Sequence, residues 1–244
     1  MTLAVIPARF ESTRFPGKVL HPILGKPMIQ HVWERVMHAT SFQHVIIATD
    51  SDEIQRRCLD FGADVVYTIQ KHSSGTSRVA EVASGLDYQI VVNVQADEPL
   101  IDPDLLDLLV RRLDETPWAS VATPIVPISE ESRFLDYNIV KLVSNRNYEI
   151  LYFSRAAIPS GFKPVPIPGQ TWEHQGVYAF RRSALLAWSH GDPSDLEKVE
   201  DLEQLRFFDL DLKILGVPSD TVSPGVNTPA DLSHVEKLMK EKKS

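Results

Sequence analysis

The sequence has little cysteine and no excess of positive charge, and each shortage removes a class of protein. Cys58 is the single cysteine among the 244 residues, so an internal disulfide and a multi-cysteine metal site are both excluded. The formal net charge of -8 at pH 7 argues against nucleic acid or an anionic membrane as the main partner. We therefore expect a reducing, cytoplasmic setting.

Long apolar runs and a dinucleotide-binding fingerprint are also missing. The apolar run at residues 3–6 is too short for a signal peptide or a transmembrane helix, so no membrane insertion is expected. No G-x-G-x-x-G motif follows this run, which disfavours a nicotinamide-dependent dehydrogenase. What is present, 43% hydrophobic and 24% charged residues, is typical of a soluble globular protein.

Short apolar runs alternate with helical patterns through the first half of the chain. The runs cover residues 3–6, 45–48, 65–67 and 90–94, and the helical patterns cover 28–40, 78–86 and 102–115, with a further helix beginning at 50–53. This alternation predicts an α/β fold with a doubly wound, mostly parallel sheet. Ligands of such sheets bind beyond the carboxyl ends of the strands. The loops at 9–18, 50–53, 72–78 and 95–99 should therefore converge on one crevice.

The pattern changes after Pro117. Extended runs with short connections, typical of antiparallel strands, occupy residues 120–128, 139–144, 150–153 and 173–180. A helix is expected over 194–208, a last strand over 213–217, and a C-terminal helix with Thr228 as its N-cap. We predict a single domain of residues 1–244 that carries a smaller, mostly antiparallel inserted part at about 120–190.

A basic loop follows the first predicted strand. Arg9, Arg14 and Lys18 place three cations in one loop, and Gly17 lets the backbone approach a ligand closely. A triphosphate needs such a cradle, because phosphoryl and nucleotidyl transfer depend mainly on positioning and charge neutralisation. On charge alone the same loop also fits a solvated surface, but the P-x-x-R-x-x-S/T-R-x-P-x-K spacing is far more specific.

A second polar segment follows the buried run at 90–94. Gln95, Asp97 and Glu98 end this strand beside Pro99. Asp97 is placed either as a Mg²⁺ ligand, a hard oxygen donor that holds a metal against substrate phosphates, or as a cap for the helix that begins near Asp102. Spacing does not choose between the two.

Together these segments resemble the 3-deoxy-manno-octulosonate cytidylyltransferase family (CMP-KDO synthetases). Further matches occur in the family's order at residues 74–78, 152–159, 174–178, 200–206 and 226–232, so the resemblance runs nearly end to end. It implies a nucleotide-diphospho-sugar transferase-like sheet, a smaller antiparallel part that aids homodimer formation, and transfer of CMP from CTP to an eight-carbon sugar acid for lipopolysaccharide synthesis.

The resemblance also assigns roles to single residues. Those implied to bind the CTP phosphates are Arg9, Arg14 and Lys18, and Asp97 and Asn227 fall at the positions of the Mg²⁺ ligands. Residues implied to contact the sugar acid are Arg78, Gln95, Arg155, His174, Tyr178 and Glu203. Arginines suit this role, because a guanidinium pairs with a carboxylate through two hydrogen bonds.

Three residues depart from the family pattern. Ala96 stands where glycine is usual, Ser77 where aspartate is usual, and Asn227 where the family has a second metal-binding aspartate. Asparagine offers Mg²⁺ an oxygen without a charge, which weakens the site. A working enzyme, a homologue that binds its ligands but has lost catalysis, and a CMP-sialic-acid-type synthetase are the alternatives.

Overall fold

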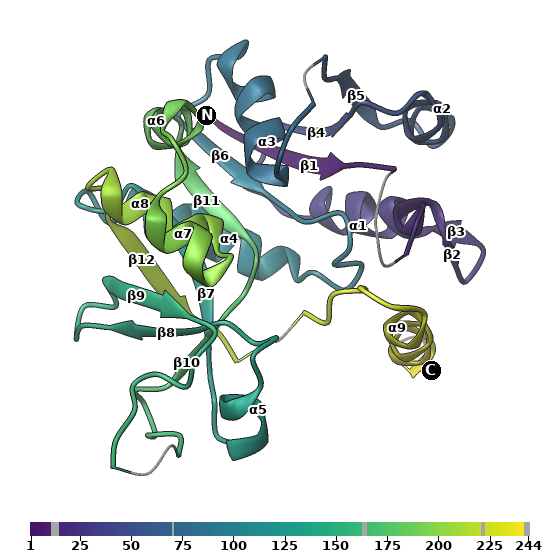
Figure 1. Cartoon of the computed structure of the whole chain (residues 1–244). Coiled ribbons are helices and arrows are strands. Elements are labelled where there is room, and N and C mark those ends of the chain that lie inside the picture. Colours follow the sequence, from purple (N-terminus) through teal and green to yellow (C-terminus); the bar gives the residue numbers. More distant parts are fainter. Residues whose placement is uncertain (11–14, 70, 163–164, 221–222, 242–244) are drawn as a thin grey trace. The chain divides into compact units, whose positions relative to one another are not determined.

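The structure is a computed structural model that describes residues 1–10, 15–69, 71–162, 165–220 and 223–241. The chain forms two compact units: unit 1 comprises Met1–Leu108 and Ser223–Ser244, and unit 2 comprises Leu109–Val222 (Figure 1). The boundary lies within helix α4 (Pro103–Asp114). Across the described residues, none of the helices combines the length and apolar character that crossing a bilayer requires.

Unit 1 is an α/β unit built on a parallel sheet. Its elements are β1 (Thr2–Ala8), the 3₁₀ turn η1 (Lys18–Leu20), β2 (Pro22–Ile23), β3 (Lys26–Pro27), α1 (Met28–Val36), β4 (His44–Thr49), α2 (Asp52–Asp60), β5 (Asp64–Tyr67), α3 (Gly75–Ser84), β6 (Ile90–Asn93) and α9 (Pro229–Glu241). The strand order is β5-β4-β1-β6, and every pair in it is parallel. Strand β1 is buried along its whole length, as its continuous apolar sequence predicts for a central parallel strand.

Helix α1 is shorter than its sequence pattern predicts. Its buried face carries Ile29, Val32 and Val36, but the helix ends at Val36 and not at Thr40. The Asp107 carboxylate accepts hydrogen bonds from the backbone N–H groups of Thr40 (2.9 Å) and Ser41 (2.8 Å). Because these N–H groups bond to a side chain, they cannot continue the helical ladder.

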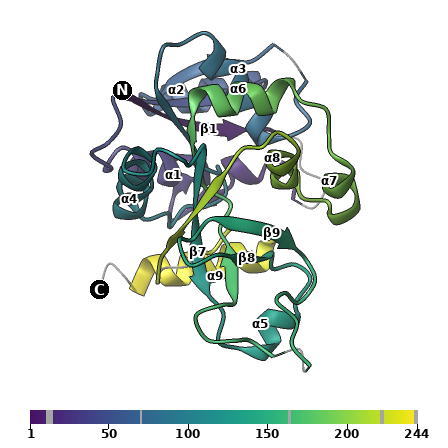
Figure 2. The same cartoon turned by 90° about the vertical axis from the view of Figure 1, so that its left-hand side faces the viewer.

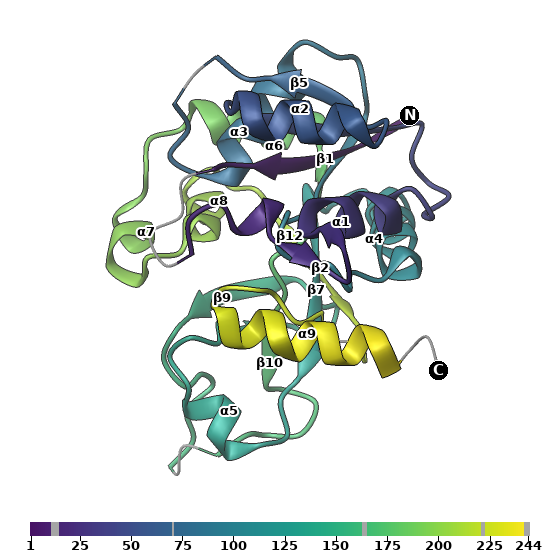
Figure 3. The ribbon, with the colours of Figure 1, turned by 90° about the vertical axis from the view of Figure 1, so that its right-hand side faces the viewer.

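A groove of about 460 Å³ lies between α1, the β2–β3 hairpin and α9, which appear together in Figure 3. Its walls include Leu24, His31, Arg35, Leu100 and Met239. The polar side chains of the groove bond to nearby residues: His31 Nε2 donates to Ile23 O (2.7 Å), and Lys26 pairs with Glu34 (2.7 Å). None of the described residues that are predicted for the functional site lines this groove.

Unit 2 is dominated by antiparallel strands. Its elements are β7 (Val121–Pro127), α5 (Glu131–Leu135), β8 (Lys141–Ser144), β9 (Ile150–Ser154), β10 (Trp172–His174), β11 (Tyr178–Arg181), α6 (Arg182–His190), α7 (Asp195–Glu200), η2 (Glu203–Leu205), α8 (Arg206–Asp209) and β12 (Ile214–Pro218). The order is β11-β7-β10-β8-β9, all antiparallel, with β12 parallel to β7. Figure 2 shows β8 and β9 as neighbouring strands.

Two predicted elements of unit 2 are interrupted. The helix predicted over 194–208 is divided into α7, η2 and α8, because Asp201 adopts a left-handed conformation with φ 53°. The extended run predicted over 173–180 is divided into β10 and β11. The Thr123 hydroxyl lies 3.0 Å from Gln175 O and 2.8 Å from Val177 O, so the carbonyls between these strands turn towards a side chain.

Candidate active site

In unit 1, Lys18 and Asp97 form an ion pair at the carboxyl ends of the parallel strands. Lys18 begins η1, directly after Gly17, which has the positive φ of 65° that glycine adopts without strain. Asp97 lies in the loop that follows β6. Lys18 Nζ is 2.5 Å from Asp97 Oδ2 and 3.0 Å from Val226 O, and the pair is only partly exposed. The first and last of the four strand-end loops that were predicted to converge on one crevice therefore contact each other.

Asn227 joins this pair from the C-terminal segment. Its Oδ1 lies 3.5 Å from Lys18 Nζ, and the preceding Val226 N–H donates to Asp97 O (2.8 Å). The Asp231 carboxylate accepts from the N–H groups of Asn227 (3.0 Å) and Thr228 (2.8 Å), while Thr228 Oγ1 accepts from Asp231 N–H (3.3 Å). These bonds form the predicted N-cap of α9, and they hold Asn227 beside Asp97.

The donor atoms around Lys18 suit a divalent cation that arrives with a nucleotide. The Lys18 ammonium is itself a stand-in cation, held by a carboxylate, a carbonyl and an amide oxygen. Mg²⁺ is commonly held by one or two carboxylates together with substrate phosphates and water, so this donor set fits it. Within the described ranges, His, Cys, Asp and Glu side chains do not gather in threes to make a complete metal site. The remaining ligands would have to come from the substrate.

Glu98, next to Asp97, adds little charge to this site near neutral pH. Its side chain is buried, and burial together with the Asp97 carboxylate raises the pKa of Glu98 to about 8. Most of the Glu98 carboxyls are therefore protonated at pH 7. Asp97 is the charged carboxylate of the pair.

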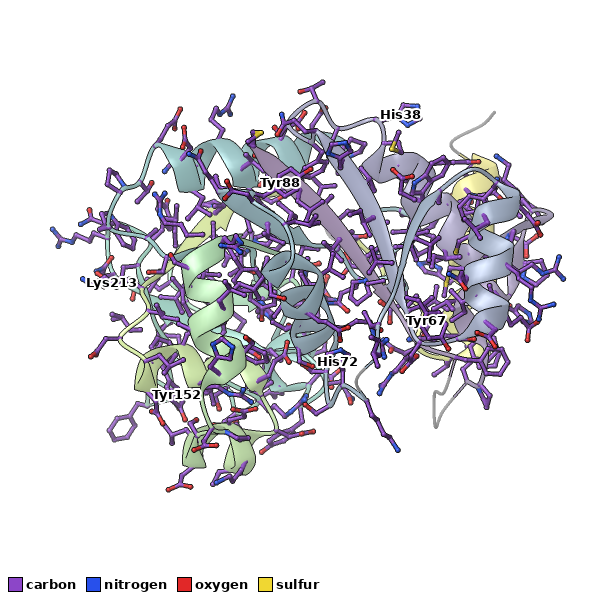
Figure 4. All side chains as sticks on the ribbon, turned by 90° about the horizontal axis from the view of Figure 1, so that it is seen from above. His38, Tyr67, His72, Tyr88, Tyr152 and Lys213 are labelled. Carbon is purple, nitrogen blue, oxygen red and sulfur yellow. The ribbon has the colours of Figure 1, made fainter. Side chains whose placement is uncertain are left out.

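Arg78 is held firmly inside unit 1. It lies in the first turn of α3 and its side chain is buried; its guanidinium pairs with Asp50 Oδ2 (2.7 Å) and also contacts the Thr68 hydroxyl. The loop before α3 is fixed by His72, whose Nε2 lies 2.5 Å from Glu81 Oε2 (His72 and Tyr67 of β5 are labelled in Figure 4). The predicted meeting of the loops at 50–53 and 72–78 is thus confirmed.

Ser77, one of the departures from the family pattern, has a local structural role. It completes a capping box at the start of α3, in which Ser74 Oγ accepts from Ser77 N–H and Ser77 Oγ accepts from Ser74 N–H, both at 3.3 Å. An aspartate could accept the same hydrogen bond at this position. The change to serine therefore preserves the helix start that presents Arg78.

The other residues predicted in unit 1 have separate surroundings. Arg9 follows β1, is exposed, and forms no ion pair with any described residue. Gln95 lies close to the start of α3: a Cβ added to Gly75 would be 3.7 Å from Gln95 Oε1 and 3.2 Å from Pro7 Cγ. Arg14 lies outside the described residues. Of the predicted unit 1 residues, the structure thus places Asp97 and Asn227 in contact with Lys18.

In unit 2, three predicted residues surround a buried aromatic cluster. The His174 ring packs against Phe153 and Tyr178, with centroids 5.2 Å away in each case. His174 Nε2 is buried and has no hydrogen-bond partner among the described residues. Burial and the nearby charge of Glu203 raise the pKa of Tyr178 well above its ordinary value. A buried ring nitrogen without a partner is ready to bond to a bound polar ligand.

Arg155, the fourth predicted residue of unit 2, directs its guanidinium at backbone carbonyls. Nε donates to Glu200 O (3.0 Å), Nη1 to Tyr137 O (3.2 Å) and Nη2 to Asp201 O (3.2 Å). Its own N–H donates to the Glu200 carboxylate (3.1 Å). Asp201 directly precedes the Leu202–Glu203 segment, so Arg155 is connected to the backbone that presents Glu203.

The neutral state of His174 has a measurable effect on stability. Burial lowers the pKa of His174 to about 3, against 6.5 in the unfolded chain. Between these pH values the His174 side chain binds a proton in the unfolded chain but not in the folded protein. Protonation therefore stabilises the unfolded chain, and the free energy of unfolding, which is unaffected by His174 above pH 6.5, decreases as the pH falls below 6.5. We expect the fall in unfolding free energy from pH 7 to pH 5 to be about 2 kcal/mol smaller in His174→Gln than in the unchanged protein. Urea unfolding at both pH values measures this difference, and equal falls would contradict it.

Sequence reasoning missed the partners of the predicted residues. The sequence places Asp50 at a helix start and in one of the strand-end loops, but it does not indicate that Asp50 contacts Arg78 or that Lys141 and Glu200 contact Arg155. One signal was available for Lys141, which is a lone charge within the extended apolar run 139–143. A charge at such a position must find buried partners.

Comparison with known proteins now adds to this geometry. The cytidylyltransferase family model matches residues 3–214. The chain is 43% identical over 242 residues to the 3-deoxy-manno-octulosonate cytidylyltransferase of Syntrophotalea carbinolica, with 96% of each chain covered. It is 42% identical over 246 residues to the mitochondrial enzyme of that name from Arabidopsis thaliana, covering 98% of this chain and 83% of the relative.

Solved structures agree with these relatives. CMP:2-keto-3-deoxy-manno-octonic acid synthetase complexed with CTP has a TM-score of 0.92 and 36% identity, with 99% of each chain covered. A cytidylyltransferase from Leptospira borgpetersenii, at 17% identity and a TM-score of 0.67 over 98% of this chain and 87% of its own, shares the fold. The predicted α/β fold, a mostly parallel sheet with a smaller antiparallel part, is thereby confirmed. The chain belongs to the cytidylyltransferase family and, within it, to the 3-deoxy-manno-octulosonate cytidylyltransferases.

Proposed function

We propose that this protein transfers CMP from CTP to 3-deoxy-manno-octulosonate and releases pyrophosphate. The observation that carries the proposal is the contact of Lys18, Asp97 and Asn227, three residues far apart in the sequence. Together they offer one ammonium and several oxygen donors at the carboxyl ends of parallel strands, where such sheets bind nucleotides. The family resemblance of the sequence implies that these positions serve the CTP phosphates and the metal.

In the proposed reaction the anomeric hydroxyl of the sugar acid attacks the α-phosphorus of CTP in line. A bond forms between that oxygen and phosphorus, the bond from phosphorus to the bridging oxygen breaks, the hydroxyl proton is released, and pyrophosphate leaves. Lys18, Arg9 and Arg14 neutralise charge on the phosphates, and Asp97 holds the cation side of the site. Mg²⁺, when bound, would polarise the phosphoryl oxygens and stabilise the leaving group.

The residues of unit 2 are proposed to hold the sugar acid. His174 Nε2 supplies a hydrogen-bonding atom from a buried ring, and Glu203 and Tyr178 lie beside it. This chemistry suits a ligand rich in hydroxyl groups. We also propose that Arg78, Gln95 and Arg155 contact the sugar acid. The same proposal includes a homodimer that uses the part at about 120–190, a cytoplasmic location and a role in lipopolysaccharide synthesis.

Pyrophosphate release tests the proposal directly. The purified protein is mixed with CTP and 3-deoxy-manno-octulosonate, with Mg²⁺ and Mn²⁺ in parallel, and with a sialic acid in place of the octulosonate in a third arm. We expect release only when CTP and the octulosonate are both present. Calorimetric binding of CTP without release under any condition would favour a binding-only homologue, and release with the sialic acid alone would favour the CMP-sialic-acid class.

Asn227→Asp tests how the missing charge affects the site. An added carboxylate beside Asp97 should bind a divalent cation more tightly, so we expect the half-saturating Mg²⁺ concentration to fall about tenfold. The control is Asn147→Asp, which adds the same charge at an exposed position of unit 2 and should leave this concentration unchanged. Activity that appears only in Asn227→Asp would refute a working enzyme.

A further inference from the structure

Lys141 is a fully buried lysine in the unit 2 sheet, on a strand that lies between β10 and β9. Its exposed fraction is 0%, and it begins β8, opposite Glu173 of β10 and Ser154 of β9. In the part of the chain that the structure describes, Lys141 forms no ion pair. An ammonium removed from water is costly unless each of its donors is satisfied, so its hydrogen bonds indicate what this lysine does.

The three N–H donors of Lys141 all reach backbone carbonyls. Nζ donates to Arg155 O (2.5 Å), Ile139 O (2.7 Å) and Asp136 O (2.8 Å). A lysine has three donors and no acceptor, so this set uses its full capacity. Burial lowers the pKa of Lys141, and the carboxylate of Asp136 opposes that shift. Lys141 therefore joins the end of β9 to the loop between α5 and β8.

Both connected segments carry residues of the proposed sugar-acid site. Arg155 is held through its own carbonyl by Lys141, and its guanidinium in turn binds the carbonyl of Tyr137, which lies between the two loop carbonyls that Lys141 holds. On the other side, Val140 O accepts a hydrogen bond from His174 N–H (2.9 Å). The residues that flank Lys141 thus support both Arg155 and His174.

We propose that Lys141 is a positioning residue that fixes the backbone of Arg155 and His174 and thereby sets the affinity for the sugar acid without touching it. The inference rests on the proposed function, because it needs the sugar acid to bind at these residues. The proposal gives the buried ammonium of Lys141 a specific structural role.

The test compares Lys141→Met with Arg181→Met. Arg181 is a matched control in the same unit: it also donates to three backbone carbonyls, those of Ala119 (2.8 Å), Leu113 (2.9 Å) and Thr116 (3.3 Å), and none of these hydrogen bonds reaches the four predicted sugar-acid residues of unit 2. Both variants should lower the melting temperature. We expect only Lys141→Met to raise KM for 3-deoxy-manno-octulosonate, about tenfold or more, with KM for CTP unchanged.

A double-mutant cycle separates positioning from general loss of stability. If Lys141 acts through Arg155, Lys141→Met should raise KM for the sugar acid much less in the Arg155→Met protein than in the unchanged protein. Additive effects on KM, an unchanged KM in Lys141→Met, or an equal rise in Arg181→Met would each overturn the inference. Should Lys141→Met fail to fold, Lys141→Gln, which retains two donors, takes its place. An unchanged protein that releases no pyrophosphate refutes the proposed function instead, so the two failures are distinguishable.

Discussion

Asp97→Asn is expected to lower kcat about a thousandfold or more. Asp97 supplies the charged carboxylate at the site, because Asn227 is neutral and Glu98, with its raised pKa, is mostly protonated at pH 7. The substitution keeps the size of the side chain and an oxygen donor but removes the charge that we propose holds a divalent cation against the phosphates. Losses of this size follow from removing one preorganised electrostatic group, and more when a metal is lost with it.

The control for this experiment is Asp104→Asn, at an exposed position in the first turn of α4. It should leave kcat within about twofold of the unchanged protein, since solvent and salt screen an exposed surface charge. Pyrophosphate release under saturating CTP and octulosonate gives kcat, and circular dichroism checks folding. Asp97→Asn with more than a tenth of the original kcat would contradict the assignment of Asp97 to the cation.

Arg206→Met is expected to reduce the free energy of unfolding by about 3–5 kcal/mol. Arg206 and Glu197 form a nearly buried two-pronged pair, with Nη2 2.6 Å from Oε1 and Nε 2.8 Å from Oε2. The Arg206 guanidinium also lies over the Trp188 ring, 4.2 Å from its centroid. Methionine would fill much of the space but would leave the Glu197 charge without a cation in a poorly solvated position, with the Ser194 N–H (3.2 Å) as its remaining hydrogen-bond donor.

Two further variants identify the cause of that loss. Adding Glu197→Gln to Arg206→Met removes the stranded charge and should recover part of the stability. Lys198→Met breaks the exposed Lys198–Asp195 pair (3.2 Å) of the same helix and should cost less than about 1 kcal/mol. Urea unfolding followed by tryptophan fluorescence measures all three. If Arg206→Met and Lys198→Met reduce the free energy of unfolding equally, the buried Arg206–Glu197 pair does not make the expected contribution to stability.

The parts of the fold and site that sequence predicted are those set by local pattern. Continuous apolar runs identify the parallel strands of unit 1, and the rule that ligands bind at the carboxyl ends of such strands predicts that the loops of Lys18 and Asp97 meet. Thr228 was recognised as an N-cap because capping depends on neighbours three residues apart.

The parts that sequence did not predict depend on long-range hydrogen bonds. The helical pattern over 194–208 does not reveal that Asp201 adopts a left-handed conformation, with its carbonyl bound by Arg155 from 46 residues earlier in the chain. The sequence also does not reveal that the Arg155 guanidinium contacts backbone carbonyls, or that the Lys141 ammonium binds the Arg155 carbonyl. Amphipathic periodicity records burial but not the partner of a buried polar group.

The contact between Lys18 and Asn227 has a consequence for how the protein is made. The two residues are 209 positions apart, and Val226 bonds to the backbone of Asp97 from the same late segment. During synthesis, Lys18 and Asp97 leave the ribosome long before this segment exists. A nascent chain therefore cannot complete the proposed cation site until residue 227 has emerged from the ribosome, well after Lys18 and Asp97 have done so.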